Sequence, residues 1–585
     1  MKHLGEFDNP AQVVGFAKLA TKATTREQLI EAWKAMLVSG LRTNEVNFLS
    51  TAMFTALKLP VEAIAAARGL ARTSGERVEI AEIPARAVGM MTGLRDGFKL
   101  AGAILRTGEQ TTGAKTETFQ QKIPGTLGEV VRSPFRPLAA SDALLRTVNE
   151  RGELYALATR QAVTEGLSLR DERFMARVNE LVANPTAAMT EQAQLEGARR
   201  TLTTPLGPGG QAFQRMVKEW GLEWVFPFTT TPGNIFKETA RMMPGANKLV
   251  REWNADYEAG GIRKDRAMAE VMVGSAIMAA VFAVAQEGGI TGGGQPDPRR
   301  RATDRAAGWK PYAVKINGQY YDGYLRMAPV GPLIGLTVDM QEFWGYMTHG
   351  ERDQWARMLA FAFANNATNQ SFFTGATNMV NVLQDPSRYG QNYFESLAGS
   401  IVPSLIGQTA ADMDPYVRQI QGMRDAIQAR IPGWREGLMP QRDLFGQPIA
   451  SPERLWVGSP FTVSAASTDK VRTEASRIGF ASPVIPKSVD VVPGMKLGAT
   501  DTVQLTPEQR DVFNSQSGQL AHAVLSQEVA SPGWDAMPLI IKRQLYEKAF
   551  KLSRDYAQTQ LLLHQDPAVT QTAVQELQRR LKEEK

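Results

Sequence analysis

The chain contains no cysteine in its 585 residues. The protein therefore forms no disulfide and has no thiolate nucleophile, zinc finger or cysteine-bound iron–sulfur cluster. Histidine is also scarce, and none of the four residues begins an HExxH or HxH pattern; they are His3, His349, His522 and His564. Because widely separated histidines are more often structural or exposed than catalytic, we expect no metal site and no cofactor.

The common motifs of nucleotide and acyl chemistry are missing as well. The sequence has no GxxxxGK[ST] loop and no GxSxG elbow. The glycine runs at 207–210 and 288–294 lack the preceding strand and following helix that a phosphate-binding loop needs. Carboxylates are plentiful, but no spacing marks a pair for glycosidic cleavage. We therefore predict a protein that is not an enzyme and has no catalytic residue.

Neither an excess of one charge nor a long apolar run is present. The chain has 66 basic and 60 acidic residues, and this mild balance permits contact with nucleic acid or anionic lipid without predicting it. The N-terminal MKHLGEFDNPAQ lacks the apolar core of a secretory signal peptide, and no stretch reaches the ~20 apolar residues of an ordinary spanning helix. We predict a chain that is made soluble in a cytoplasm.

The longest uncharged stretch lies between Glu270 and Glu287, within a helix predicted over 267–286. A helix of that uncharged length would measure ~24 Å, against ~30 Å for a hydrocarbon core. It is either a buried core helix or a segment that enters a membrane with help from neighbours. Small residues recur in it every fourth position, which permits close helix contacts in lipid or in a soluble bundle. The candidate packing or membrane residues are Gly274, Ser275, Ile277, Ala279, Phe282 and Ala283.

Two further clusters are candidate interaction surfaces. An aromatic cluster either anchors at a bilayer interface or wedges helical layers together; it comprises Trp220, Trp224, Phe226 and Phe228. A basic cluster either contacts phosphates of DNA or lipid, or lies on a solvated loop; it comprises Arg299, Arg300, Arg301 and Arg305.

Helical periodicity dominates the rest of the chain. Thr24 and Thr506 have capping-box spacing at predicted helix starts. Asn317-Gly318 is the turn pair of a type I′ hairpin, which we place at about 312–325. Frequent proline and glycine over 430–504 predict an extended, irregular segment that wraps over other elements or over a neighbouring subunit. The predicted fold class is mainly α: an elongated multi-helix protein with one short β-hairpin and one extended segment.

The same patterns divide the chain into six predicted regions. They are an N-terminal helical region (1–106), a linker (107–140), a helical region with the aromatic cluster (141–260), a module of apolar helices and hairpin (261–429), the extended segment (430–504) and C-terminal helices (505–585).

One long run, GGITGGGQPDPRRRATDRAAGWKPYAVKINGQYYDGYLRMAPVGPLIGLTVDM, resembles a module of tailed-phage and prophage proteins, one of the large polyvalent protein-associated domains. In that module an apolar helix and a glycine-rich turn precede a tryptophan, a Pro-Tyr pair, a hairpin and a Pro-x-Gly-x-x-x-Gly-Leu helix. The matching residues are Trp309, Pro311, Tyr312, Asn317, Gly318, Pro329, Gly331, Gly335 and Leu336. The segments PFTTTPGNIFK, LRTNEVNFLSTAMFTALKLP and LTPEQRDVF resemble regions that accompany it.

The resemblance implies an internal virion, or ejection, protein. Such a protein lies inside the capsid, leaves with the genome and assembles as a homo-oligomer into a conduit across the host envelope. Its expected location is therefore the interior of the virion, and after ejection the host periplasm or cell envelope. The implied partners are other virion or ejection proteins, phage DNA bound without sequence preference, and host membrane lipids. The alternatives are a structural core or tail-adaptor protein, and a delivered effector or peptidoglycan-degrading enzyme.

Overall fold

The computed structural model describes residues 23–72, 76–108, 122–295, 297–344, 395, 397–490 and 502–563. The contacts between residues divide the chain into two compact units. Unit 1 consists of Met1–Gly293, Gly323–Leu405 and Trp456–Pro460, and unit 2 of Gly294–Asp322, Ile406–Leu455 and Phe461–Lys585. The prediction of a mainly helical protein with a short hairpin is confirmed.

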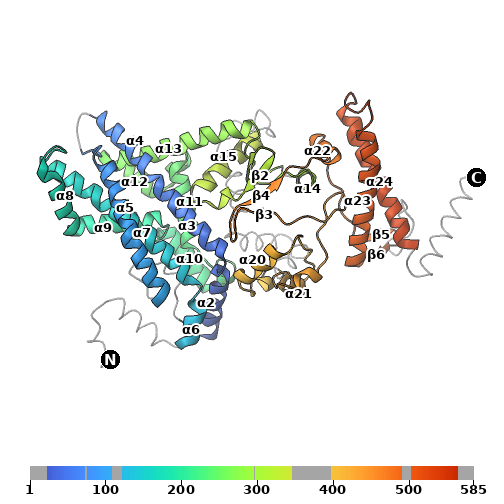
Figure 1. Cartoon of the computed structure of the whole chain (residues 1–585), viewed down its shortest axis with the longest axis horizontal. Helices are drawn as coiled ribbons and strands as arrows, with labels where there is room; N and C mark the ends of the chain where they lie inside the picture. Colours follow the sequence, from blue (N-terminus) through green and yellow to red (C-terminus); the bar gives the residue numbers. More distant parts are fainter. Residues whose placement is uncertain are drawn as a thin grey trace, which may run out of the picture. The chain divides into compact units, whose positions relative to one another are not determined.

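Unit 1 is built almost entirely of α-helices (Figure 1). They are α2 (Thr25–Val38), α3 (Leu41–Ala56), α4 (Lys58–Leu70), α5 (Glu82–Thr107), α6 (Gly125–Arg132), α7 (Phe135–Thr164), α8 (Glu172–Ala183), α9 (Ala187–Arg200), α10 (Pro208–Glu219), α11 (Thr230–Met242), α12 (Arg251–Ala259), α13 (Gly261–Gln286) and α15 (Val330–Trp344). The capping box predicted at Thr24 is present, with Glu27 as its second member. Short 3-10 helices lie at Leu222–Trp224, Ala246–Leu249 and Tyr324–Arg326.

A glycine stripe explains the closest helix pair in unit 1. Gly89, Gly93 and Gly97 recur every fourth residue on one face of α5 and lie against α7. A Cβ on Gly93 would lie 2.9 Å from the Cα of Val148, so only glycine allows this backbone approach. Gly89 meets α7 near Arg151 and Gly97 meets it near Leu144, so the two helices run antiparallel.

The main apolar core of unit 1 lies where α4, α11, α13 and α15 meet. Ala65, Met243, Ala269 and Leu333 are almost fully buried in it. Figure 1 shows α4 and α13 side by side, in agreement with this shared core. The glycine-rich turn after α13 is bound to α15, because the N–H of Gly293 donates to Asp339 Oδ1 at 2.8 Å.

Unit 2 contains a small antiparallel sheet in the order β1-β2-β4-β3. Its strands are β1 (Ala313–Ile316), β2 (Gln319–Asp322), β3 (Glu453–Arg454) and β4 (Thr462–Ala465). Asn317 and Gly318 connect β1 to β2 and both have positive φ, so the predicted hairpin and its turn are confirmed. The strand β4 pairs with the other edge of β2, where Val463 lies opposite Tyr321.

The prediction of an irregular segment over 430–504 is incomplete. The described part of it contains β3, β4, the helix α22 (Lys470–Arg477) and the strand β5 (Ser488–Asp490), which pairs with β6 (Thr502–Gln504). Of these strands, β4 has a distant partner, because it pairs with β2, and no local pattern specifies such a partner. The start of α22 is set by Asp469, whose side chain accepts the N–H groups of Val471 and Arg472.

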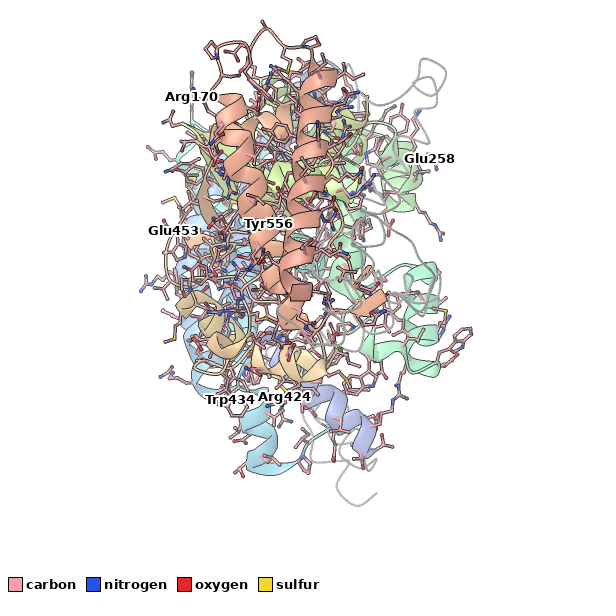
Figure 2. The ribbon with its side chains drawn as sticks, turned by 90° about the vertical axis from the view of Figure 1, so that its right-hand side faces the viewer. Arg170, Glu258, Arg424, Trp434, Glu453 and Tyr556 are labelled. Atoms are coloured by element: carbon pink, nitrogen blue, oxygen red, sulfur yellow. The ribbon has the colours of Figure 1, made fainter. Side chains whose placement is uncertain are left out.

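The helices of unit 2 are α14 (Pro298–Ala306), most of α20 (Ser404–Met413), α21 (Met423–Gln428), α22, α23 (Pro507–Val529) and α24 (Leu539–Leu563), with a 3-10 turn at Arg435–Gly437. The last three of these helices, α22, α23 and α24, pack around an aromatic core. Figure 2 shows α23 and α24 side by side. Phe480 stacks on Phe550 at 5.2 Å between ring centroids, and Tyr546 donates its hydroxyl to the carbonyl oxygen of Val471 at 2.8 Å. Thr506 and Gln509 form the second predicted capping box.

Candidate functional site

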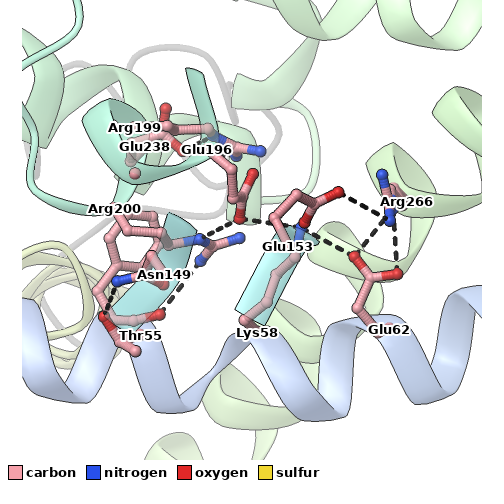
Figure 3. Close-up of polar contacts among 12 residues, drawn as sticks. Thr55, Lys58, Glu62, Asn149, Glu153, Glu196, Arg199, Arg200, Glu238 and Arg266 are labelled. Atoms are coloured by element: carbon pink, nitrogen blue, oxygen red, sulfur yellow. Dashed lines mark hydrogen bonds and ion pairs between the residues drawn. The ribbon is translucent and has the colours of Figure 1, made fainter. Parts of the chain in front are cut away.

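A buried network of charged side chains surrounds the first half of α13 (Figure 3). Arg86 of α5 lies with Nη1 2.5 Å from Oε2 of Glu153 on α7, and both side chains are 1% exposed. Arg266 of α13 lies with Nε 2.9 Å from Oε1 of Glu62 on α4. Because these four side chains come from four helices, the network ties α4, α5, α7 and α13 together.

Lys58 extends the network toward α9. Its Nζ lies 2.8 Å from Glu62 Oε1 and 2.9 Å from Glu196 Oε1, and Arg200 Nε reaches the same Glu196 oxygen at 2.8 Å. The guanidinium of Arg200 lies 4.3 Å from the ring centroid of Phe54 and donates to the Phe54 carbonyl oxygen at 3.1 Å. These contacts give each of the two cations more than one partner, which buried charges require.

A second branch joins α13 to α9, α11 and α12. Arg199 Nη2 lies 2.6 Å from Glu238 and 2.7 Å from Glu270. Arg241 Nε lies 3.0 Å from Glu270, and its Nη2 lies 2.9 Å from Asp256. Glu270 is therefore held between two guanidinium groups on other helices.

The electrostatics of the network keep its carboxylates ionised. Burial raises the pKa of Glu270, but the cations of Arg199 and Arg241 outweigh it and hold that pKa at about 2. Burial likewise raises the pKa of Glu153, while Arg86 gives the largest opposing effect and the net pKa is lowered. A carboxylate with a lowered pKa is a poor general base at neutral pH, so we interpret this network as a structural clamp.

The second half of α13 has the opposite character. Val281 and Ala285 pack against Val338 of α15 on one side. The outward face carries Phe282, which is 42% exposed, and a row of small or flexible apolar residues: Met272, Ala276, Ala279, Ala280 and Ala283. At helical spacing this row lies on one face. The clamp thus fixes the N-terminal half of α13, and the C-terminal half of the same helix exposes an apolar surface.

The six residues predicted on this helix divide between packing and exposure. Gly274 is buried, and a Cβ there would lie 1.9 Å from the Met242 carbonyl oxygen, so glycine allows α13 to touch the end of α11. Ile277 packs on the core, and Ser275 donates its hydroxyl to Val271 O of its own helix at 2.7 Å. The remaining three are on the exposed face; they are Ala279, Phe282 and Ala283.

The predicted aromatic cluster is divided in the same way. Trp224 packs against Trp33 with 4.8 Å between ring centroids, and Phe226 meets Phe213 edge-on at 5.1 Å. Phe228 packs at the small core around Ala35, Val38 and Phe135. Trp220 alone among the four is largely exposed, at 73%.

The four predicted arginines lie on or at the start of α14. Arg300 donates to the carbonyl oxygen of Gly479 at 3.1 Å, and Arg299 pairs with Asp297 at 3.4 Å. Arg301 and Arg305 have no carboxylate partner within the described ranges, and burial lowers the pKa of Arg305. Two of the four therefore have partners within the chain, and two remain available to a phosphate.

An arrangement in unit 2 resembles a catalytic triad. His522 Nε2 lies 2.6 Å from Asp469 Oδ2, and Ser526 Oγ lies 3.4 Å from His522 Nδ1. However, the Ser526 hydroxyl donates its proton to the His522 carbonyl oxygen at 2.7 Å, the usual contact of a serine inside a helix. Asp469 is the cap of α22; burial raises its pKa, but hydrogen bonds from His522 and the backbone outweigh burial, so the net pKa is lowered. The geometry is that of a helix cap and does not activate Ser526.

Within the described residues, no group of three or more Asp, Glu and His side chains could hold a metal ion. Two described segments are long and apolar enough to cross a membrane, Leu41–Leu70 and Gly261–Gln286. The second exceeds the length expected from its uncharged part, because α13 starts ten residues earlier. Soluble core helices meet the same criterion, and Leu41–Leu70 contains Lys58 and Glu62 of the clamp.

Comparisons with known proteins give no relative of this chain. No protein-family model matches it, and neither a curated protein nor a solved structure matches it.

Proposed function

We propose that the protein is an internal virion protein of a tailed phage, of the ejection type. It is non-enzymatic, leaves the capsid with the genome and assembles as an oligomer into a conduit for DNA across the host envelope. The proposal rests on two grounds. One is the resemblance between residues 288–340 and the polyvalent protein-associated module, and the other is the set of properties of α13.

The observation that carries the proposal is the exposed apolar face of α13. Small side chains such as Ala276, Ala279 and Ala283 allow a second helix to approach closely, either in lipid or between copies of the chain. The ion pairs of Arg266 and Glu270 hold the first half of α13 against the neighbouring helices, so the position of the exposed face is fixed. An exposed apolar face of this kind is typical of an interaction surface.

Two further features support a non-enzymatic role. The carboxylates of the clamp are paired with arginine or lysine, and Ser526 is not activated by His522. The absence of cysteine also favours passage through a narrow portal, since no disulfide has to be reduced before the chain unfolds.

The test is release of dye from vesicles together with the fate of the protein during infection. Purified full-length protein should release an entrapped dye, and Phe282→Gln should reduce that release several-fold. Leu249→Gln is the matched control, because Leu249 is 86% exposed in unit 1 but lies outside α13. Both variants should unfold at the temperature of the wild type.

Virions that carry the protein give the second arm. An ejection protein is lost from particles after genome release, whereas a core or tail-adaptor protein stays in the emptied particles. Retention together with no dye release would contradict the proposal, and clearing of peptidoglycan in a zymogram would instead indicate an enzyme.

A further inference from the structure

Helix α5 carries a second exposed apolar surface, separate from α13. Its inner face bears the glycine stripe that packs on α7. Its outer side exposes Met91 by 70% and Phe98 by 64%, with Leu94 and Leu105 also exposed. Four large apolar side chains on one solvent-facing helix exceed the scattered exposure expected of a soluble surface.

These four side chains form a continuous stripe. At 100° per residue, Met91, Leu94, Phe98 and Leu105 fall within an arc of about 60° and extend over about 21 Å of the helix axis. Gly102 lies next to the stripe, and a Cβ there would meet no other atom within 4 Å. Among the described residues, nothing covers the helix at this point, and the four side chains of the stripe are all exposed.

A basic rim borders the stripe on the side away from α7. Arg95, Lys99 and Arg106 fall within about 40° of one another by the same helical spacing. Arg106 Nε donates to the carbonyl oxygen of Gly102 on its own helix, and in the described part of the chain neither Arg95 nor Lys99 pairs with a carboxylate.

The acidic group nearest in sequence is already neutralised. By the same helical spacing, Asp96 lies about 60° beyond Lys99 in the direction of α7, where its Oδ2 is 3.1 Å from Nη2 of Arg151. The stripe is thus bordered by cations whose charge is not balanced by α5 itself.

We propose that this outer face of α5 binds the surface of an anionic phospholipid bilayer. Met91, Leu94, Phe98 and Leu105 enter the boundary between headgroups and acyl chains, and the basic rim contacts the headgroup phosphates. A stripe of large apolar side chains beside a basic rim is the arrangement of interfacial helices that lie in the membrane plane. The charge of the rim is the reason to choose an anionic bilayer as the occupant over an uncharged apolar partner.

The inference goes beyond the proposed function, because α5 would lie on a membrane whereas α13 would form contacts within an assembly. It holds for the chain whether or not the protein forms a conduit. The two proposals therefore fail separately.

The test is co-sedimentation of the full-length protein with vesicles of phosphatidylglycerol and phosphatidylcholine, compared with phosphatidylcholine alone. Phe98→Gln should lower the partition coefficient on the anionic vesicles about tenfold, the effect expected for one large apolar side chain. Lys99→Gln should lower it about fivefold, and raising the salt concentration should weaken binding of the wild type.

Leu249→Gln and Phe282→Gln are the matched controls for exposed apolar residues outside α5, and both should bind anionic vesicles as the wild type does. The proposal is overturned if Phe98→Gln and Lys99→Gln bind like the wild type, or if both kinds of vesicle bind equally. It is also overturned if no vesicle binds while Phe98→Gln changes the oligomeric state, because the face then lies between copies of the chain. Loss of dye release in Phe282→Gln with unchanged binding would bear on α13 alone.

Discussion

The two units differ in the contacts that supplement their apolar packing. In unit 1, helices meet through an apolar core and also through a network of buried ion pairs, such as Arg86 with Glu153 and Arg241 with Glu270. In unit 2, the core between α22, α23 and α24 is rich in aromatic rings, and Phe480 contacts both Tyr546 and Phe550. Paired buried charges require fixed partners and geometry, whereas apolar contacts mainly require volume. Unit 1 should therefore be more sensitive to loss of one partner and to acid than unit 2.

The largest expected effect is the removal of one charge from the clamp. Glu153→Ala leaves Arg86 buried beside a missing partner and should cost unit 1 about 3–5 kcal/mol of unfolding free energy. Hydrogen exchange measured on peptides of α5 and α7 should rise, while peptides of α23 and α24 keep wild-type protection. The double variant Arg86→Met/Glu153→Leu should recover most of the loss, because an apolar pair of similar volume replaces the ion pair. Loss of protection in both units alike would contradict the comparison.

The second largest effect is expected from acid, which should destabilise unit 1 more than the α23–α24 pair of unit 2. Glu270 has a pKa of about 2 in the folded chain, well below that of the free side chain. A lowered pKa gives stability that is fully present above the unfolded value of 4.5 and is lost as the pH falls toward 2, on the order of 3 kcal/mol for this residue.

Hydrogen exchange across this pH range should therefore show unit 1 opening before the α23–α24 pair. Glu474 borders the aromatic core beside α23 and α24, and hydrogen bonding from Arg477 is the largest cause of its lowered pKa. Because Arg477 is 54% exposed, solvent screens this pair, and the α23–α24 pair should lose a smaller amount of stability. Glu270→Gln tests the assignment, since it should remove part of the acid dependence of unit 1. Simultaneous opening of both units would argue against a special role of the clamp.

A smaller effect is expected from one polar contact inside the aromatic core. Tyr546→Phe keeps the ring but leaves the Val471 carbonyl oxygen without this donor, at a cost of about 1–2 kcal/mol. Chemical denaturation followed by exchange in α24 measures it. Tyr556→Phe is the control, because Tyr556 is 56% exposed and should change stability very little (Figure 2).

The smallest effect on stability is expected on the apolar end of α13. Phe282→Gln changes an exposed side chain and should alter the unfolding free energy by less than about 0.5 kcal/mol. The buried counterpart Val281→Gln should cost several times more, since Val281 is 8% exposed and packs on Val338. Equal effects of the two variants would show that the outer face is not free in solution.

Much of the fold could be predicted from local pattern. The caps at Thr24 and Thr506 and the Asn317-Gly318 turn are local interactions, and each is found where its residues predict it. The pairing of β2 with β4 was missed, because its hydrogen bonds join segments 140 residues apart and involve backbone atoms.

The candidate site was predicted in part. The apolar run of α13 was evident from composition, but its division into a packed and an exposed side depends on α11 and α15. The glycine spacing of α5 was readable as Gly89, Gly93 and Gly97, a signal of close helix contact that sequence reasoning overlooked. The clamp had a weaker signal, in that Lys58 and Glu62 lie four residues apart at the start of a mostly apolar helix.

By itself, the sequence determined where helices begin, where the hairpin turns and which chemistry is excluded, because caps, turn residues and the lack of cysteine act over a few residues. The tertiary structure decided which charges are buried together and which apolar faces remain exposed. Arg266 and Glu270 are ordinary charged residues of a helix until α4, α7, α9 and α11 bring their partners to distances of 2.7–3.7 Å. Ion pairing and exposure depend on distances between helices, and those distances are set only when the helices pack.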